Sequence, residues 1–298
     1  MNYNIGAEKK QALLEKIQKK RGYNKQITTV LKTMGEELRA AYIDGCATYI
    51  EVTTTEEMAR ITNANFCRQR LCNVCAWRRQ ARYYSQMVDV ERVMRERGYT
   101  AGRFYFTTLT VKNCWSQDVG KTVGKMLEAW KRLVNNRNIK SRIEGYVRAI
   151  EITYNQERKN YHPHIHVVFA LKEGAEPPKA DSLAKSWAAA MDLEYTPIID
   201  IRQCKDGTNK DVIKYSLKYR YKDVNQTTIS TYLYTLAGKR LVSFGGIYSK
   251  IRRELRQNNF DEALTDEKAG GGENIEGVIV EHYLINTTSG IYELVKEE

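Results

Sequence analysis

The sequence predicts an α+β fold in which a central antiparallel sheet, covered by helices on one face, is preceded by a cysteine-rich helical region. Three segments, residues 104–112, 145–154 and 162–170, combine β-branched and aromatic residues with alternating polarity, as half-buried strands do. Stretches with helical periodicity follow the first and third segments, at residues 119–135 and 179–192. This order of strand, helix, strand pair and helix is typical of an antiparallel sheet with helices packed against it.

The N-terminal part of the chain is predicted to be helical. Residues 8–42 are highly charged but place apolar side chains at helical spacing, which indicates an amphipathic helix packed on the rest of the protein. Residues 43–75 contain four of the six cysteines in short, irregular segments. A helix is expected over residues 76–97, because its apolar side chains form one stripe, and Gly98 suits the end of that helix.

Charge is distributed unevenly along the chain. The 298 residues carry a formal net charge of +12, with a pI near 9.3. Residues 257–298 hold ten Asp and Glu against two Lys, a net of −8, which leaves +20 on residues 1–256. A body this basic attracts polyanions through counterion release, so nucleic acid is the first partner to expect. An anionic membrane is the competing partner, but the sequence has no 18-residue apolar run and no strongly apolar helix face.

Four cysteines, Cys46, Cys67, Cys72 and Cys75, follow the spacing C-x20-C-x4-C-x2-C. The two-residue gap lets both thiolates of the last pair reach one tetrahedral ion, and the other two can complete the four-sulfur shell of structural zinc. The alternative is a set of buried free thiols around a chance C-x2-C pair. Cations nearby would offset the charge of a zinc tetrathiolate and could contact DNA phosphates. They are Arg68, Arg70, Arg78 and Arg79.

Three of the four histidines lie in residues 162–166. Alternate residues of a strand share a face, so His164 and His166 point the same way and form half of a divalent-metal site. Glu151 lies between two isoleucines in the preceding strand and would reach the same ion if residues 155–161 form a hairpin loop. A mixed nitrogen and oxygen ligand set suits Mg²⁺ or Mn²⁺. The alternative is that these side chains face solvent.

A further helical stretch, residues 211–222, places Asp211 and Tyr215 side by side at i, i+4 spacing. A tyrosine hydroxyl, with an ordinary pKa of about 10, attacks poorly unless its target is polarised or its proton is removed. A metal on the scissile phosphate would supply the first of these, and Lys218, one turn after Tyr215, could stabilise the phenolate or hold the phosphate. A purely structural tyrosine is the alternative, because the chain contains 20 tyrosines.

Together these segments resemble the three successive motifs of rolling-circle plasmid replication initiators, which belong to the HUH endonucleases. The matching segments are residues 106–113, 162–166 and 211–215, in the family's order. Residues 64–79 are also similar to the cysteine region of initiators from Gram-positive plasmids. The resemblance covers about residues 43–250 and implies an HUH endonuclease domain.

The resemblance implies that Tyr215 is the nucleophile and that His164 and His166 hold the metal, with Glu151 as the third ligand. In this plasmid branch, the acidic residue four positions before the tyrosine is usually glutamate and is taken to activate water for a second, terminating cut. This chain has Asp211 there, one methylene shorter, which puts that role in question.

Other residues of the motifs have secondary roles. Tyr219 is a minor alternative to the nucleophile, and His162 lies on the ligand face but is left outside the first shell. Lys112 and Lys214 join the four arginines as expected DNA contacts.

The implied activity is that of a site-specific single-strand DNA endonuclease and strand transferase. It would nick the plasmid origin, leave a 5′-phosphotyrosine link and a free 3′-hydroxyl for a host polymerase, and rejoin or release the strand at termination. Trp115 replaces the first glycine of a phosphate-binding loop ending in residues 120–122, so no ATPase is indicated and unwinding falls to a host helicase. Two rivals remain: a non-catalytic zinc-containing DNA-binding regulator, and a relaxase or transposase of the same chemistry.

Three regions are expected: an N-terminal helical and zinc-binding region (1–98), a nuclease domain (99–255) and an acidic C-terminal extension (256–298) with a glycine-rich hinge. The first 25 residues lack the apolar core of a signal peptide, so we expect a soluble protein of the bacterial cytoplasm. Cysteines there are metal ligands or buried thiols rather than disulfides. The oligomeric state is left open, with a dimer as one alternative.

Overall fold

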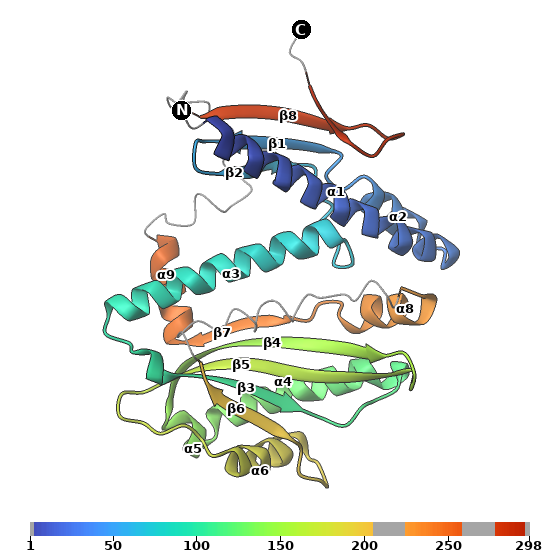
Figure 1. Ribbon diagram of the computed structural model, residues 1–298. Coiled ribbons are helices and arrows are strands. Elements are labelled where there is room, and N and C mark those ends of the chain that lie inside the picture. Colours follow the sequence, from blue (N-terminus) through green and yellow to red (C-terminus); the bar gives the residue numbers. More distant parts are fainter. Residues whose placement is uncertain (1–2, 205–223, 258–277, 296–298) are drawn as a thin grey trace. The chain divides into compact units, whose positions relative to one another are not determined.

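The computed structural model describes residues 3–204, 224–257 and 278–295 (Figure 1). Its internal contacts divide the chain into two compact units. Unit 1 consists of Met1–Arg78, Val224–Ile229 and Asp261–Glu298, and unit 2 consists of Arg79–Asp223 and Ser230–Phe260. Two of the divisions fall inside helices, one in α3 (Asn73–Glu96) and one in α8 (Gln226–Thr235).

Unit 1 begins with two consecutive helices, α1 (Tyr3–Thr33) and α2 (Glu37–Asp44). The turn between them uses Gly35 at a φ of 75°, a left-handed conformation that glycine adopts without strain. The amide of Glu36 then donates to the carbonyl of Leu31 at 2.9 Å. The helical pattern at residues 8–42 is therefore confirmed, as two helices rather than one.

A four-stranded antiparallel sheet completes unit 1, in the order β2-β1-β8-β9. On β1 the side chains of Ile50 and Val52 are fully buried. The hydroxyl of Tyr292 donates to the carbonyl of Ala47, just before β1. The strands are β1 (Tyr49–Thr54), β2 (Ala59–Ala64), β8 (Ile279–Ile285) and β9 (Tyr292–Leu294).

This sheet differs from the sequence-based expectation. Residues 43–75 were expected to be irregular, but they contain the β1–β2 hairpin, and β8 pairs with β1 from Thr54 opposite Ile279 to Tyr49 opposite Leu284. The last strands thus belong to the same sheet as β1. Pairing between opposite ends of a chain leaves no local signal in the sequence, because strand periodicity shows a strand but not its partner.

Unit 2 contains a five-stranded antiparallel sheet in the order β6-β3-β5-β4-β7. The three strands expected from the sequence are confirmed as β3, β5 and β4, and β4 and β5 form a long central hairpin. Its strands are β3 (Phe104–Thr110), β4 (Ile143–Asn155), β5 (Asn160–Leu171), β6 (Ile199–Gln203) and β7 (Val242–Gly246). Its helices include α4 (Val119–Asn135), α5 (Arg137–Lys140), α6 (Ala180–Met191) and α9 (Ile247–Gln257), with short 3-10 turns at Ala101–Arg103 and Ser116–Asp118.

One face of this sheet packs against α4 and α6. Ile165, Val167 and Phe169 of β5 lie in a core with Trp130 of α4 and Trp187 of α6. The helices expected at residues 119–135 and 179–192 are thus confirmed.

The opposite face is partly covered as well, which corrects the expectation of helices on one face only. Val168 and Ala170 of β5 pack with Val90 and Met94 of α3 and with Tyr248 of α9. Residues 167–171 of β5 are apolar without interruption, as in a strand buried on both faces. The fold class itself, a mixed α+β fold with antiparallel sheets, is confirmed.

Across the described ranges, no helix is both long and apolar enough to cross a membrane.

Candidate metal centre and cysteine site

The β4–β5 hairpin brings three ligand-type side chains together on one face of the unit 2 sheet. In the strand register Glu151 lies opposite His164, and Ala149 lies opposite His166. Glu151 Oε2 lies 2.9 Å from Nε2 of His164 and 2.9 Å from Nε2 of His166. One ligand atom from each residue lies within 4.8 Å of the others. The structure thus brings together the three residues grouped from the sequence.

The hydrogen bonds of His164 determine which of its ring nitrogens is available to a metal. His164 Nδ1 lies 3.1 Å from the carbonyl oxygen of His162, and a carbonyl can only accept. In the neutral ring Nδ1 therefore carries the proton, and Nε2 presents its lone pair to Glu151 Oε2. Two lone pairs at 2.9 Å need a cation beside them, either a proton on the ring or a metal ion.

The spacing of these atoms fits a metal ion. Ligand atoms in adjacent positions of an octahedral ion, with bonds of about 2.1 Å, lie about 3 Å apart. Glu151 Oε2 stands at that separation from both imidazole nitrogens. The donor set of two imidazoles and one carboxylate suits a divalent ion such as Mg²⁺ or Mn²⁺.

The three ligand-type side chains of the centre are buried, and the carboxylate among them is ionised. Glu151, His164 and His166 each expose only 8% of their surface. Burial by itself would raise the pKa of Glu151, but the hydrogen bonds and positive charges of His164 and His166 lower the pKa to about 2. The carboxylate is therefore ionised at neutral pH, as a metal ligand must be.

Residues of β3 hold His166 in place. Thr108 Oγ1 lies 3.2 Å from His166 Nδ1, and the Phe106 ring stacks on His166 with centroids 5.4 Å apart. The guanidinium of Arg202, on β6, lies 5.1 Å from the centre of the Phe106 ring. Such neighbours fix the orientation of a metal-binding imidazole. Thr108 lies in the motif at residues 106–113, but the sequence predicts no role for it, because the register that pairs it with His166 is a tertiary feature.

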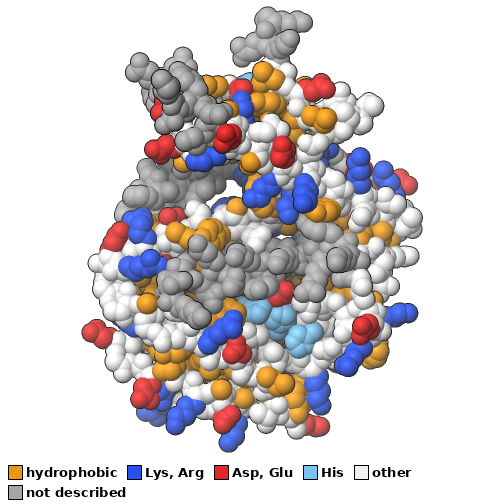
Figure 2. Space-filling view, viewed as in Figure 1, with side chains coloured by type: hydrophobic (Ala, Val, Ile, Leu, Met, Phe, Trp, Pro, Cys, Tyr) orange, Lys and Arg blue, Asp and Glu red, His pale blue; other side chains and the backbone are white. Residues whose placement is uncertain are grey.

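His162 lies beside the centre but outside the ligand group. Its Nδ1 lies 2.8 Å from Asn113 Oδ1, and Asn113 Nδ2 donates to Asn160 Oδ1 at 3.0 Å. Burial, followed by the charge of His164, lowers the pKa of His162. Figure 2 shows histidine side chains gathered in one patch of the visible face. This agrees with the sequence-based expectation, in which His162 is not a metal ligand.

The four grouped cysteines converge in unit 1. Cys75 Sγ lies 3.6 Å from Cys46 Sγ and 3.7 Å from Cys67 Sγ, and all four sulfurs lie within 4.8 Å of one another. Sulfurs on a tetrahedral zinc ion, with bonds of about 2.3 Å, are about 3.8 Å apart, whereas a disulfide bond is about 2.05 Å long. All four thiols are free, so the arrangement fits a structural zinc ion.

Polar groups around the cysteines support this arrangement. Asn24 of α1, only 2% exposed, donates from Nδ2 to Cys72 Sγ at 3.4 Å and accepts from the amide of Asn73 at 2.8 Å. Hydrogen bonds from the Cys46 and Cys67 thiols lower the pKa of Cys72, which favours the thiolate that zinc binds. Asn24 is not among the residues predicted from the sequence. The available signal was a polar residue on the buried face of an amphipathic helix.

The cations predicted to contact DNA are spread over both units. Arg68 is exposed, and Arg70 and Arg78 are partly buried in unit 1, with the Arg78 guanidinium 4.0 Å from the centre of the Phe66 ring. Arg79 and Lys112 belong to unit 2, where Lys112 Nζ lies 4.3 Å from the centre of the Tyr195 ring.

The predicted tyrosine helix lies outside the described residues. This concerns Asp211, Lys214, Tyr215, Lys218 and Tyr219, whose roles stay predictions.

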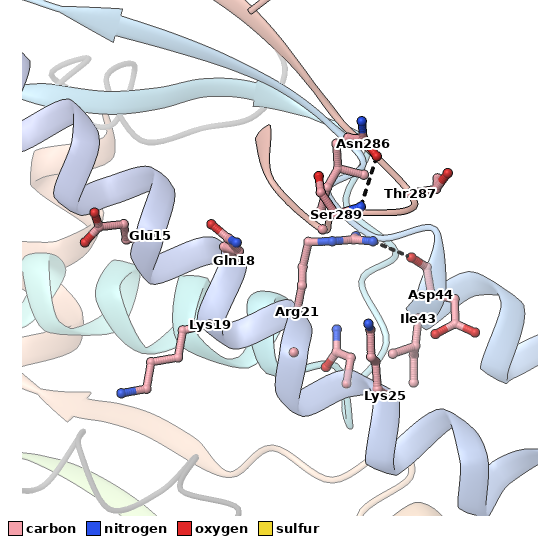
Figure 3. Close-up of a pocket in the computed structure, with 14 residues that line it drawn as sticks. Glu15, Gln18, Lys19, Arg21, Lys25, Ile43, Asp44, Asn286, Thr287 and Ser289 are labelled. Atoms are coloured by element: carbon pink, nitrogen blue, oxygen red, sulfur yellow. Dashed lines mark hydrogen bonds between the residues drawn. The ribbon is translucent and has the colours of Figure 1, made fainter. Parts of the chain in front are cut away.

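A cavity of about 580 Å³ lies in unit 1 (Figure 3). It is bounded by α1, by Ile43 and Asp44 at the end of α2, and by the turn between β8 and β9. Arg21 donates to the carbonyl of Asp44 at 3.0 Å and also to the carbonyl of Cys46, so its side chain links the cavity wall to the cysteine site. No member of either ligand group lines this cavity.

The chain resembles known replication proteins over most of its length. A family model described as "Replication protein" matches residues 58–289. "Protein rep" of Streptococcus pneumoniae serotype 2 is 29% identical over 262 residues, which cover 83% of this chain and 78% of the relative. "Protein rep" of Bacillus amyloliquefaciens is 31% identical over 274 residues (78% and 80%), and that of Staphylococcus aureus is 26% identical over 220 residues (70% and 93%). No solved structure matches the chain significantly.

Proposed function

Because the chain belongs to the replication protein family, we propose that it initiates rolling-circle replication of a bacterial plasmid by nicking one strand at the origin. The observation that carries this proposal is the buried group of Glu151, His164 and His166 on the β4–β5 hairpin. A DNA-binding protein without catalysis has no use for a pre-organised ligand set with an ionised carboxylate in its sheet. A nuclease needs such a set to act on a phosphodiester.

Glu151, His164 and His166 would hold the divalent ion, and a bound ion would polarise the scissile phosphate and offset charge that develops in the transition state. The protein's own contribution is to fix the ligands. The carbonyl of His162 orients His164, and Thr108 with Phe106 orients His166. The basic body of the protein, including Lys112 and Arg79, would draw the strand toward unit 2.

Tyr215 would carry out the cleavage as a transesterification. Its hydroxyl oxygen attacks phosphorus, and the bond between phosphorus and the 3′-oxygen breaks. The tyrosine hydroxyl loses its proton, and the leaving 3′-oxygen takes up a proton. The products are a 5′-phosphotyrosine link and a free 3′-hydroxyl that a host polymerase extends. Lys218, three residues after Tyr215, would stabilise the phenolate, and Lys214 would contact the strand.

Termination would use the same site. Because the phosphotyrosine keeps the energy of the phosphodiester, the strand can be rejoined by attack of a 3′-hydroxyl. Asp211 would position a water that releases the strand at the closing cut. Unwinding would fall to a host helicase. Zinc at Cys46, Cys67, Cys72 and Cys75 would stabilise unit 1 rather than take part in bond chemistry.

The test is an adduct assay on a single-stranded oligonucleotide from the plasmid's own origin, labelled at its 3′ end, with Mn²⁺ present. Tyr215→Phe should abolish the covalent protein–DNA adduct while origin binding stays within about twofold, because the change removes one hydroxyl group. Tyr219→Phe is the matched control and should retain the adduct. An adduct that persists in Tyr215→Phe would move the nucleophile to another tyrosine. A wild-type protein that binds its origin without ever forming an adduct would support the non-catalytic regulator instead.

A further inference from the structure

Helix α1 carries a cluster of cations beside the first turns of α3, within unit 1. Lys16, Lys19 and Lys20 are spaced i, i+3 and i+4, so their side chains lie on one side of the helix. Lys16 Nζ lies 5.2 Å from the centre of the Trp77 ring on α3. Burial, and then the like charges of Lys16 and Lys19, lower the pKa of Lys20. The three ammonium groups are therefore close enough to repel one another.

Carboxylates do not neutralise Lys16 and Lys19, the two exposed lysines of this cluster. Glu15 stands one turn before Lys19, but its Oε1 accepts from Gln11 at 3.0 Å. Within the described ranges, neither Lys16 nor Lys19 forms an ion pair with an acid. Other lysines of α1 do have acidic partners: Lys10 pairs with Glu281 at 2.6 Å, and Lys32 pairs with Asp44 at 3.5 Å. Concentrated positive charge of this kind is stabilised by a polyanion.

The contact with Trp77 indicates which part of a nucleic acid this cluster would bind. A single-strand site needs an aromatic face on which bases can stack, but the Trp77 ring is partly buried and has the Lys16 ammonium over it. The ring instead holds Lys16 in position, which reduces the side-chain entropy lost on binding. Cations held in this way suit phosphates, which fix a protein on a duplex without reading its sequence.

We propose that Lys16, Lys19 and Lys20, braced by Trp77, form a docking surface for the sugar–phosphate backbone of duplex DNA. We call this the α1 lysine surface. It rests on the proposed function only in taking DNA as its ligand, and it shares no residue with the metal centre of unit 2. The surface would anchor unit 1 on the duplex independently of strand cleavage.

The test compares two double variants of the full-length protein on a fluorescein-labelled 30-base-pair duplex of mixed sequence, across a salt series. In Lys16→Gln/Lys19→Gln, affinity should fall roughly tenfold near 0.15 M salt, and the slope of log affinity against log salt should become shallower by about 2, one phosphate contact for each lysine. Glutamine keeps most of the side-chain stem, and unchanged zinc content and circular dichroism would show that unit 1 is folded.

Lys25→Gln/Lys32→Gln is the matched control, because it removes the same charge from the same helix. Lys25 is nine residues, or two and a half turns, from Lys16 and so lies on the opposite side of α1. This control should bind the duplex within about twofold of wild type. Equal losses in both double variants, or no loss in Lys16→Gln/Lys19→Gln, would overturn the proposal.

A 30-nucleotide single strand separates the duplex assignment from general charge attraction. Lys16→Gln/Lys19→Gln should lose less affinity for this single strand than for the duplex. An equal loss on the single strand would overturn the assignment to duplex DNA. Adduct formation, measured on the same preparations, reports on the proposed function separately. A wild type without adduct but with the expected duplex difference would refute the cleavage reaction and leave the α1 lysine surface standing.

Discussion

The three side chains of the candidate metal centre should contribute unequally to its activity. His164→Ala or His166→Ala should abolish nicking of the origin oligonucleotide. Each imidazole is held in place by its neighbours, and a water molecule cannot replace a ligand oriented in this way. Glu151→Ala should reduce nicking and be partly restored by excess Mn²⁺, since water can occupy a carboxylate's place on the ion.

The measurement is the initial nicking rate at several Mn²⁺ concentrations, with His162→Ala as the control. That control should retain most activity, because His162 lies outside the ligand group. Undiminished nicking by His166→Ala, or by wild type after chelation, would rule out the metal assignment.

Asp211 stands where the initiators that this chain resembles usually have glutamate. If it positions water for the closing cut, Asp211→Ala should spare the first nick and slow release of the bound strand, so that adducts accumulate. Asp211→Glu should retain or improve release, because the longer side chain reaches further.

A time course on the labelled oligonucleotide would score adduct and released 5′-phosphate product separately. Loss of the first nick in Asp211→Ala, to the extent seen in Tyr215→Phe, would show instead that the residue acts on the tyrosine or the metal.

At the scale of elements, β8 and β9 connect the C-terminal part of the chain to the cysteine site. β8 pairs with β1 along all six residues of β1, and Tyr283 and Tyr292 are 6% and 7% exposed. The Tyr292 hydroxyl donates to the carbonyl of Ala47, the residue after Cys46. Removal of residues 278–298 should therefore expose the core of unit 1 and weaken zinc retention.

Thermal unfolding and zinc content of the truncated protein would measure this effect. Loss of stability should lower the melting temperature by roughly 2–4 °C for each kcal/mol in a chain of this size. Removal of residues 296–298 alone is the control and should leave both quantities unchanged. Full zinc content and an unchanged melting temperature in the longer truncation would contradict a structural role for β8 and β9.

At the scale of the whole molecule, the two ligand groups lie in different units. The cysteines belong to unit 1, and the Glu151, His164 and His166 group belongs to unit 2. Purified protein should carry about one zinc per chain, lost in Cys72→Ser/Cys75→Ser, and the loss should lower stability far more than the rate of adduct formation on a single-stranded oligonucleotide.

Elemental analysis of reduced protein, with Cys114→Ser as the control, would test this expectation. Cys114 stands apart from the cluster, so its replacement should leave zinc bound. Wild-type protein without zinc would contradict the division of roles between the units. So would a Cys72→Ser/Cys75→Ser variant whose rate of adduct formation falls as far as its stability.

The sequence by itself determined the features that depend on short-range pattern. Alternating polarity identified β3, β4 and β5, and the same alternation placed His164 and His166 on one face. Spacing grouped the four cysteines, and the hairpin expectation brought Glu151 to the histidines. These features could be predicted because neighbours along the chain fix which side of a strand each residue faces.

Only the tertiary structure decided which distant segments meet. The pairing of β8 with β1, the packing of α3 and α9 on the second face of the sheet, and the contact of Thr108 with His166 join residues far apart in sequence. The same holds for Asn24, which reaches Cys72 across 48 positions. Periodicity shows that a residue is buried but does not specify its partner. That choice depends on strand register and core packing, which are set by the free energy of the whole chain.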